Sequence, residues 1–385
     1  MKELYKKNKS IILYFVVYCP IGILCPLIAQ YLDSIGFSGT EVGVITSVGT
    51  AMAVFGGLFW GRLYANVANK RLIISLMFIG AAVTALISLK ITAFIPYAII
   101  YGILYFFQGP SHGLCDTMVI TNGEDFPIIR AFGAIGYAAA CFVGGKVSQA
   151  AGLDKIFYIH AAMFLLGAII VMTEQEPPHI NEKKEKVSAL LLLKEKKFLK
   201  LLLCSFFVLG CTMANNTYFS YLYIDAGGDL AGVGFCFLLM AGSEAVMMCI
   251  LPKLLKKIHT EKLLAIGIAV GVIRFFIYSL GPGKGVLIGT FFTQGIMDGI
   301  ILVEIVKYFV KVVDIKLSDI SVSTYYALGT NLSSIVCNLI GGRLIDKVGA
   351  TGTYLFFAIM IAIGLILYLL FGLYKENEPD HIKQA

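Results

Sequence analysis

The sequence predicts an all-α membrane protein whose twelve transmembrane helices form two parallel six-helix pseudo-repeats. Composition is the first reason: 58% of the 385 residues are hydrophobic, only 14% are charged, and the mean hydropathy is +0.84. Soluble domains carry about 25% charged residues, so a chain this apolar is expected to lie in a bilayer. The other two reasons are a series of long apolar segments and a repetition of the first half of the chain in the second.

The apolar segments give the expected spans, since a transmembrane helix needs about 20 predominantly apolar residues. We expect spans at residues 11–32, 40–61, 72–90, 94–119, 129–151, 155–173, 199–224, 230–252, 263–281, 285–307, 320–343 and 351–373. The segment Met1–Ser10 is basic, but no small-residue cleavage site follows the first apolar run, so no cleavable signal peptide is expected.

One long polar segment divides the chain. Residues 174–198 contain Pro177-Pro178 and a run of charged residues at 182–186. We therefore expect an N-terminal six-helix bundle over residues 1–173, a linker over 174–198 and a C-terminal six-helix bundle over 199–385.

The lysine and arginine residues predict the orientation, because they are enriched in cytoplasmic loops. With twelve spans, both tails and the linker lie on the same side. That side holds 24 of the 31 basic residues, the other side holds six, and Arg274 lies within a span. Both termini are expected in the cytoplasm. The net charge of +7 is then a topology signal and gives no reason to expect nucleic-acid binding.

The internal repetition predicts how the halves are related. A shift of 191 residues places Val42-Gly43 on Val233-Gly234, and a shift of 197 residues places Gly144-Gly145 on Gly341-Gly342. Six spans per half make the copies parallel, related by an axis along the membrane normal. One large class of transporters has this arrangement.

Two related stretches, at residues 108–113 and 294–299, share the pattern Gln-Gly-x-x-[His/Asp]-Gly. The ionisable residue is His112 in the first copy and Asp298 in the second. A charged group at the centre of a transmembrane helix costs about 2.5–3.5 kcal/mol by insertion scales, so such residues usually have a function. We expect the two helices to face each other across a substrate path, with Gln294 at its wall.

A group of ionisable residues is expected near the end of the fourth span. His112 and Asp116 are four residues apart and share a helix face. Arg130 opens the fifth span within reach of Asp116. The pair can open and close during transport, or it can be a static ion pair near the headgroups.

The second half carries Glu244, Arg274, Asp298 and Glu304 within its spans. One arginine cannot neutralise three carboxylates, and an unpaired carboxylate in a low-dielectric interior binds a proton more readily than in water. These residues predict proton coupling, or alternatively a fixed network of Glu244, Arg274 and Asp298 that holds the half together.

Uncharged polar residues complete the candidate site. Asn215 and Asn216 in the seventh span can hydrogen-bond a polar solute or join helices to one another. His160 is expected near the membrane interface in a structural role. The nine cysteines form no CxxC motif or Cys/His cluster, so neither a disulfide nor a metal site is expected, and no cofactor is indicated. The sequence lacks a nucleotide-binding Gly-x4-Gly-Lys-[Ser/Thr] motif and the HExxH and GxSxG motifs of hydrolases, so we expect no enzyme.

Several of these segments resemble the major facilitator superfamily, in particular its lactose-permease-like and nucleoside-symporter-like proton symporters. The most specific are Ile129–Tyr137, Gly242-Ser243-Glu244 and Val272-Ile273-Arg274. The resemblance implies that Asp116 and Arg130 hold substrate hydroxyls and that Tyr137 stacks on the substrate ring. It implies further that Glu244 and Arg274 belong to the network that carries the proton and tunes affinity.

Two positions depart from the pattern of these symporters. Gln294 takes the place of a histidine, and Met297 takes the place of the proton-carrying acid, with Asp298 one position later. Gly61-Arg62-Leu63-Tyr64-Ala65 carries alanine where the wider superfamily has aspartate. We therefore expect either that the coupling site is rebuilt around Asp298 or that proton coupling is weaker, and gating at this loop is expected to differ.

The resemblance implies a bacterial, multi-pass transporter of the cytoplasmic membrane, acting as a monomer. We expect inward symport of a small neutral polar solute, a sugar or nucleoside, with protons by alternating access. Substrate would be bound by Asp116, Arg130, Tyr137, His112, Asn215, Asn216 and Gln294, and the proton would be carried or tuned by Glu244, Arg274 and Asp298. The alternatives are proton-driven efflux of amphipathic compounds and a membrane sensor without transport.

Overall fold

The computed structural model describes residues 2–177, 188–254 and 256–375, and almost all of them are helical. The first half contains α1 (Lys2–Leu24), α2 (Ile28–Ser34), α3 (Gly39–Asn66), α4 (Lys70–Ser88), α5 (Phe94–Thr121), α6 (Phe126–Ala151) and α7 (Lys155–Thr173). The second half contains η1 (Ala189–Lys194), α8 (Lys196–Asp225), α9 (Leu230–Leu254), α10 (Thr260–Ser279), α11 (Lys284–Lys311), η2 (Ile315–Leu317), α12 (Ser318–Thr324), η3 (Tyr325–Leu332) and α13 (Ser333–Leu370).

Every predicted span corresponds to helix. Within the described residues, nine helices are long and apolar enough to cross a membrane, or ten if α1 and α2, bent by 41°, form one span. Ile315–Leu370 is one of the nine, yet it contains two predicted spans, because the helix breaks at Gly349. Gly349 has a φ of 73°, a conformation that only glycine adopts without strain. The twelfth predicted span is α5, which is not one of the nine helices. Its polar residues Gln108, His112 and Asp116 lower its hydropathy. The predicted fold class is confirmed.

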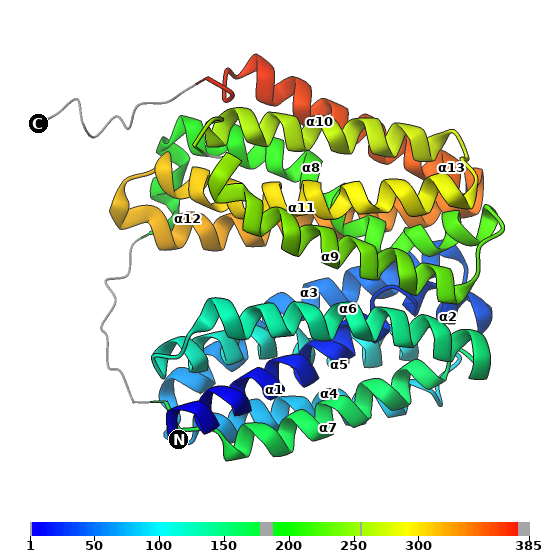
Figure 1. Ribbon diagram of the computed structural model, residues 1–385. Coiled ribbons are helices and arrows are strands. Elements are labelled where there is room, and N and C mark those ends of the chain that lie inside the picture. The colour runs from blue at the N-terminus through cyan, green and yellow to red at the C-terminus, as the bar shows by residue number, and fades with distance from the viewer. Residues whose placement is uncertain (1, 178–187, 255, 376–385) are drawn as a thin grey trace, which may run out of the picture.

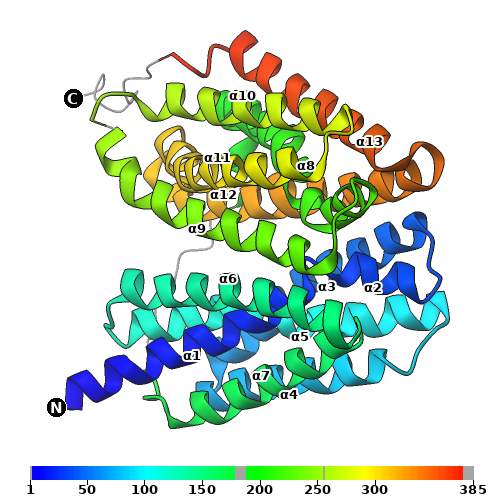
Figure 2. The ribbon, with the colours of Figure 1, turned by 45° about the vertical axis from the view of Figure 1, so that its right-hand side comes forward.

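The helices form two bundles, one stacked on the other in Figure 1. Helices α1 to α7 pack on one another, chiefly α1 on α6 and α7, α3 on α5, and α4 on α5 and α7. Helices α8 to α13 make the other bundle, chiefly through α8 with α13, α9 with α11, and α10 with α11 and α13. The bundles meet where α6 packs on α9 and α3 packs on α13, and the rotated view in Figure 2 shows the same contact faces. The domain limits predicted from the sequence stay a prediction, and the charged run at 182–186 lies outside the described residues.

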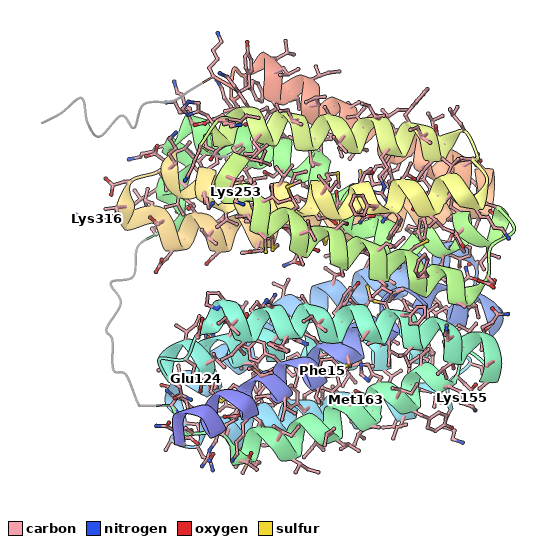
Figure 3. All side chains as sticks on the ribbon, in the orientation of Figure 1. Phe15, Glu124, Lys155, Met163, Lys253 and Lys316 are labelled. Atoms are coloured by element: carbon pink, nitrogen blue, oxygen red, sulfur yellow. The ribbon has the colours of Figure 1, made fainter. Side chains whose placement is uncertain are left out.

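The two ends of the molecule differ. The start of α1 and the end of α13 lie at one end, which we call the termini end (Figure 1). Glu124 and Lys316 also lie there, whereas Lys155 lies at the far end (Figure 3). Helix α3 begins at the far end with a capping box, in which the Ser38 side chain accepts from the Glu41 N–H and the Glu41 carboxylate accepts from the Ser38 N–H. Such reciprocal capping fixes the start of the helix where the chain turns back.

Glycines join the bundles at the far end in two equivalent contacts. A Cβ added to Gly234 would lie 3.1 Å from the Cα of Gly145, and one added to Gly342 would lie 3.1 Å from the Cα of Gly43. These are the glycines that the sequence repeat equates, Gly43 with Gly234 and Gly145 with Gly342. Glycine lets helix backbones approach this closely. The repeat therefore appears in the structure as a pair of matching helix crossings.

Side chains reinforce both crossings. The Asp346 carboxylate of α13 accepts from the N–H groups of Gly39 and Thr40 at 2.7 and 2.8 Å and from the Thr40 hydroxyl at 2.5 Å. At the other crossing, the Gln149 side chain of α6 accepts from the Leu230 N–H at 3.1 Å. Each side chain thus caps the first turn of a helix in the opposite bundle, where unpaired N–H groups and the helix dipole favour an acceptor. Within the described residues, close backbone contacts and these hydrogen bonds therefore join the two bundles at the far end.

Candidate functional site

A cavity of about 280 Å³ lies between the two bundles. Helix α5 contributes Tyr101, Tyr105, Gln108, Gly109 and His112, and α3 contributes Thr46, Thr50 and Ala53, with Ile21, Cys25 and Ile28 beside them. The other bundle contributes Met213, Asn216, Thr217, Thr330, Asn331, Ser334 and Asn338. Among the described residues, no carboxylate, lysine or arginine lines this cavity. Its polar groups are amides, hydroxyls and one imidazole, which suit a neutral polar ligand.

On the N-terminal side of the cavity, α5 presents two buried residues of the first related stretch. Gln108 is 3% exposed, and its Oε1 accepts from His160 Nε2 of α7 at 2.7 Å. His112 is 8% exposed, and its Nε2 donates to the carbonyl oxygen of Val17 at 3.0 Å. His160 is fully buried beside Gln108, which fits the structural role expected for it, whereas its position near the membrane interface stays a prediction. With its Oε1 held by His160, the Gln108 amide nitrogen remains for the cavity.

A local irregularity shapes the opposite wall. Residues Tyr325–Leu332 of η3 form a π-helix between α12 and α13, and Thr330 and Asn331 of this segment line the cavity. π-helical turns occur mostly as local insertions in α-helices and frequently at functional sites. Here the irregular turn presents polar side chains at the middle of an otherwise apolar span.

Asp116 and Arg130 lie on the termini side of the cavity and are not part of its lining. The Arg130 guanidinium is 3.5 Å from the Asp116 carboxylate and 4.6 Å from the ring centre of Tyr18. Asp116 also accepts a hydrogen bond of 2.7 Å from the Tyr14 hydroxyl. The Arg130 side chain is 46% exposed, and it interacts electrostatically with Glu244 and Tyr326 of the other bundle. The structure thus brings Asp116 and Arg130 together, as the sequence predicted, in an open position between the bundles.

Tyr137 is half-buried on α6, two turns beyond Arg130. It lies near Cys25, a residue of the cavity wall, and near Glu244 across the interface. This position, between the cavity and Arg130, is one from which an aromatic ring can contact a solute in passage.

Arg274 lies inside the C-terminal bundle and is 2% exposed. It donates to Gln294 Oε1 at 2.5 Å and to the Tyr278 hydroxyl at 3.2 Å, and its guanidinium lies 4.7–5.2 Å from the ring centres of Phe275, Tyr278 and Phe291. Gln294 Oε1 also accepts from Asn215 at 2.8 Å, and Asn215 Oδ1 accepts from the Tyr354 hydroxyl at 2.7 Å. Asn215 and Gln294, predicted to bind substrate, are instead fully buried in this network.

The acids of the second half fall into two groups. Asp298 is 7% exposed and interacts electrostatically with Glu244 and Arg274, but within the described residues no ion pair closer than 4.0 Å joins Arg274 to either acid. Glu304 is paired with Lys307 at 2.6 Å and accepts from the Thr260 hydroxyl at 2.6 Å. Glu304 therefore has a fixed structural environment. Within the described residues, neither Glu244 nor Asp298 forms an ion pair closer than 4.0 Å, and Asp298 interacts with the Gln294 side chain.

The sequence interpretation missed most of the cavity wall, including Thr46, Thr50, Tyr101, Tyr105, Thr330, Ser334 and Asn338. The sequence did contain a signal for part of this cavity wall. Asn331, Ser334 and Asn338 recur at spacings of three and four, which places them on one face of a helix within an apolar span. Periodic polar residues in such a span indicate a face turned away from lipid.

Replacing His160 by phenylalanine is expected to weaken substrate binding without preventing folding. The change removes the donor that fixes Gln108 Oε1, so the amide can rotate and its nitrogen is no longer directed to the cavity. We expect KM for uptake to rise several-fold, by about the 0.5–1.5 kcal/mol of a typical hydrogen bond, with little change in maximal rate. Gln108→Ala should give a similar KM, and the double variant should be no worse than either single one. Additive effects of the two changes would contradict this role.

Two helical bundles of membrane-spanning helices with a polar cavity between them define the protein as a membrane transporter. The sequence profile of the MFS_1 like family matches residues 9–356, and the chain belongs to this family. It is not an enzyme but a multi-pass transporter of a small molecule.

Individual relatives cover nearly the whole chain. The maltose permease of Geobacillus stearothermophilus is 25% identical over 374 residues, which are 95% of this chain and 94% of the permease. A protein of Escherichia coli (strain K12) provisionally named nucleoside transporter YegT is 25% identical over 394 residues, 92% of this chain and 90% of that protein. The crystal structure of nucleoside transporter NupG matches with a TM-score of 0.81 and 18% identity, covering 96% of this chain and 99% of that chain. A bacterial homologue of the lysosomal transporter Spinster, inward-facing and occupied, matches with a TM-score of 0.77 and 12% identity over 96% of each chain.

Proposed function

We propose that the protein is a proton-coupled symporter that carries a small neutral polar solute, a sugar or a nucleoside, into the cell. The observation that carries this proposal is the chemistry of the cavity between the bundles. Among the described residues, its lining offers amides, hydroxyls, aromatic rings and the His112 imidazole but no carboxylate, lysine or arginine, while Asp116, Arg130, Glu244 and Asp298 lie outside it. Relatives named for maltose and for nucleosides support the same class of solute.

The orientation follows from the basic residues. The side of the membrane with both tails carries 24 of the 31 lysines and arginines, so the termini end faces the cytoplasm. The glycine crossings then close the extracytoplasmic end. We expect a monomer in the cytoplasmic membrane, surrounded by lipid, that alternates between this closure and its opposite.

The residues have different roles in this proposal. His112 and Asn216 bind the solute directly, because both line the cavity. Asp116, Arg130 and Tyr137 lie next on the path toward the cytoplasm and hold the solute as it leaves. Asn215 and Gln294 act indirectly, because Gln294 accepts from Arg274 and from Asn215 and so helps to fix Arg274 inside the C-terminal bundle.

Proton coupling is assigned to Glu244 and Asp298, tuned by Arg274. Glu244 interacts electrostatically with Arg130 in the other bundle and with Asp298 in its own. Movement of the bundles changes the distance between Glu244 and Arg130, so it changes the positive charge that acts on the carboxylate and links the protonation of Glu244 to the conformation. Such a link between bundle movement and protonation is what symport requires.

The proposal is tested by uptake of radiolabelled sugars and nucleosides into energised membrane vesicles. We expect one class of solute to accumulate and an uncoupler to abolish the accumulation. In Glu244→Gln and Asp298→Asn, accumulation should fall about tenfold or more, while exchange of preloaded solute, which needs no net proton movement, continues. Glu304→Gln is the matched control, because its carboxylate is already paired with Lys307. Accumulation that survives the uncoupler would exclude proton coupling, and extrusion of amphipathic dyes without solute uptake would favour efflux.

A further inference from the structure

Four consecutive leucines form the short helix η1 at the start of the second half, and three of them point away from the protein. Helix η1 packs on α8 and α12, and Leu192 is buried in the core at 2% exposed. Leu190, Leu191 and Leu193 are 71%, 41% and 62% exposed. This segment lies outside the expected spans, where such side chains would face water. A cluster of exposed leucines at this position indicates a surface that something else covers.

A second short helix repeats this pattern beside the same helix α12. Helix η2 also packs on α12, and its Ile315 is 86% exposed whereas its Leu317 is 7% exposed. Like η1, it lies between expected spans, and Figure 3 places its Lys316 at the termini end. Two segments far apart in the sequence thus present large apolar side chains next to one helix. We call these exposed residues the η rim: Leu190, Leu191, Leu193 and Ile315.

Lysines accompany both parts of the η rim. Residues 194–200, which lead into α8, contain four lysines and one acid. The side chains of Lys194, Lys196 and Lys316 are exposed, and in the part of the chain that the structure describes none of them forms an ion pair. Asp314 of η2 instead caps its own helix, where it accepts from the backbone N–H of Lys316 at 2.9 Å. The apolar rim is therefore edged by cations that are available to an anionic partner.

An apolar surface edged with such lysines fits the headgroup region of a bilayer. Leucine and isoleucine side chains enter the boundary between headgroups and acyl chains, while lysine side chains extend to the headgroups. A cluster of about four to eight basic residues next to a membrane-spanning helix is typical of segments that bind anionic lipids. The lysines at 194–200 form such a cluster directly before the expected span at 199–224.

We propose that the η rim is a lipid-binding surface, in which its apolar side chains enter the membrane interface at the termini end and Lys194, Lys196 and Lys316 bind anionic headgroups. This surface is separate from the cavity and from the residues assigned to solute and proton. It lies beside α12, which continues through η3 into the cavity wall. Lipid held at the η rim therefore lies at the base of the helix that forms this wall.

Fluorescence quenching tests the apolar part of the surface. Trp60 is the only tryptophan in the sequence, so Leu193→Trp in a Trp60→Phe background gives a single reporter. In proteoliposomes made with lipids brominated near the headgroup end of the acyl chains, we expect its emission to fall by about half. Ile273→Trp is the matched control, because Ile273 is 61% exposed near the middle of a span. It should be quenched more strongly by lipids brominated deep in the chains.

The quencher identifies what covers the η rim. Strong quenching of the reporter at position 193 by aqueous acrylamide, without quenching by brominated lipid, would place it in water. Quenching by neither reagent would show that the protein itself covers this position. Either result would overturn the proposal. Thermal melting of each variant checks that the tryptophan substitutions have not unfolded the protein.

Melting temperatures in lipid nanodiscs test the charged part. We expect the wild type to melt several degrees higher when a third of the phosphatidylcholine is replaced by phosphatidylglycerol, and added salt should reduce this shift. Lys194→Gln with Lys196→Gln should lose most of the shift. Lys90→Gln with Lys347→Gln removes the same charge from exposed lysines at the far end and should retain it. Equal shifts in the two double variants would contradict headgroup binding. Neither measurement needs a transported solute, so failure here leaves the proposed function standing.

Discussion

Replacing Gly234 by tryptophan is expected to abolish accumulation of the solute by preventing closure of the far end. The Cβ position of Gly234 already lies 3.1 Å from the Cα of Gly145, and the Cys141 carbonyl is closer still. Backbone atoms of α6 cannot move aside as a flexible side chain can, so an indole ring must separate α6 from α9. The transporter would then remain open at the end that we assign to the outside. We expect uptake to fall by a factor of about ten or more, as for a conformational equilibrium shifted by over 1.4 kcal/mol.

A chemical label can report this change directly. Cys25 lines the cavity, so a membrane-impermeant maleimide added outside intact cells should modify it slowly in the wild type and rapidly in Gly234→Trp. Cys25→Ser in the same background removes the signal and serves as the labelling control. Gly242→Trp is the matched substitution, because it lies on the same helix and its Cβ would meet nothing within 4 Å.

The sequence repeat provides a second, equivalent variant for this test. Gly342→Trp disrupts the equivalent crossing against Gly39 and Gly43 and should produce the same labelling pattern. Normal uptake by either tryptophan variant, or outside labelling of Cys25 that is equally fast in the wild type, would show that these crossings do not form the closed gate.

Replacing Arg274 by methionine is the second change with a large expected effect. The guanidinium is buried, donates to Gln294 and Tyr278, and lies against three aromatic rings. It also supplies the positive charge that acts on Asp298. Hydrogen bonds from charged groups contribute about 1.5–3 kcal/mol each, so we expect a clear fall in melting temperature together with loss of accumulation.

Further variants distinguish the contribution of the Arg274 charge from that of its hydrogen bonds and ring contacts. Arg274→Lys keeps the charge but cannot form the planar fork or the ring contacts, so it should recover only part of the stability. Asp298→Asn added to Arg274→Met should restore some stability, because it removes the acid left without a counter-charge. Arg343→Met changes an exposed arginine on α13 and should leave the melting temperature unchanged. An Arg274→Met protein as stable and active as the wild type would contradict both roles of the residue.

The fold was predictable from the sequence because its determinants are local. A helix in a bilayer satisfies its own backbone hydrogen bonds, so a sufficient apolar length identifies each span without knowledge of its neighbours. The same locality explains why Asp116 and Arg130 were paired correctly, since the short connection between α5 and α6 keeps them close. The sequence also revealed the glycines of the repeat as matching positions. It did not reveal that these glycines contact one another.

Adjacent Asn215 and Asn216 show what the sequence could not decide. They point about 100° apart on α8. The structure turns Asn215 into a network with Gln294 and Tyr354, whereas Asn216 faces the cavity. His160, expected near the membrane interface in a structural role, is a buried partner of Gln108, a contact that the sequence did not predict because it depends on how α5 and α7 pack.

From the sequence alone came the spans, the duplication and the presence of polar groups where lipid would exclude them, because each depends on apolar length or on composition along one helix. Only the tertiary structure decided which polar groups line the cavity, which hold Arg274, and which carbonyls lie against the glycines. Those assignments depend on the rotation of each helix about its axis. That rotation is set by packing against helices far away in the sequence, and adjacent residues respond to it in opposite ways.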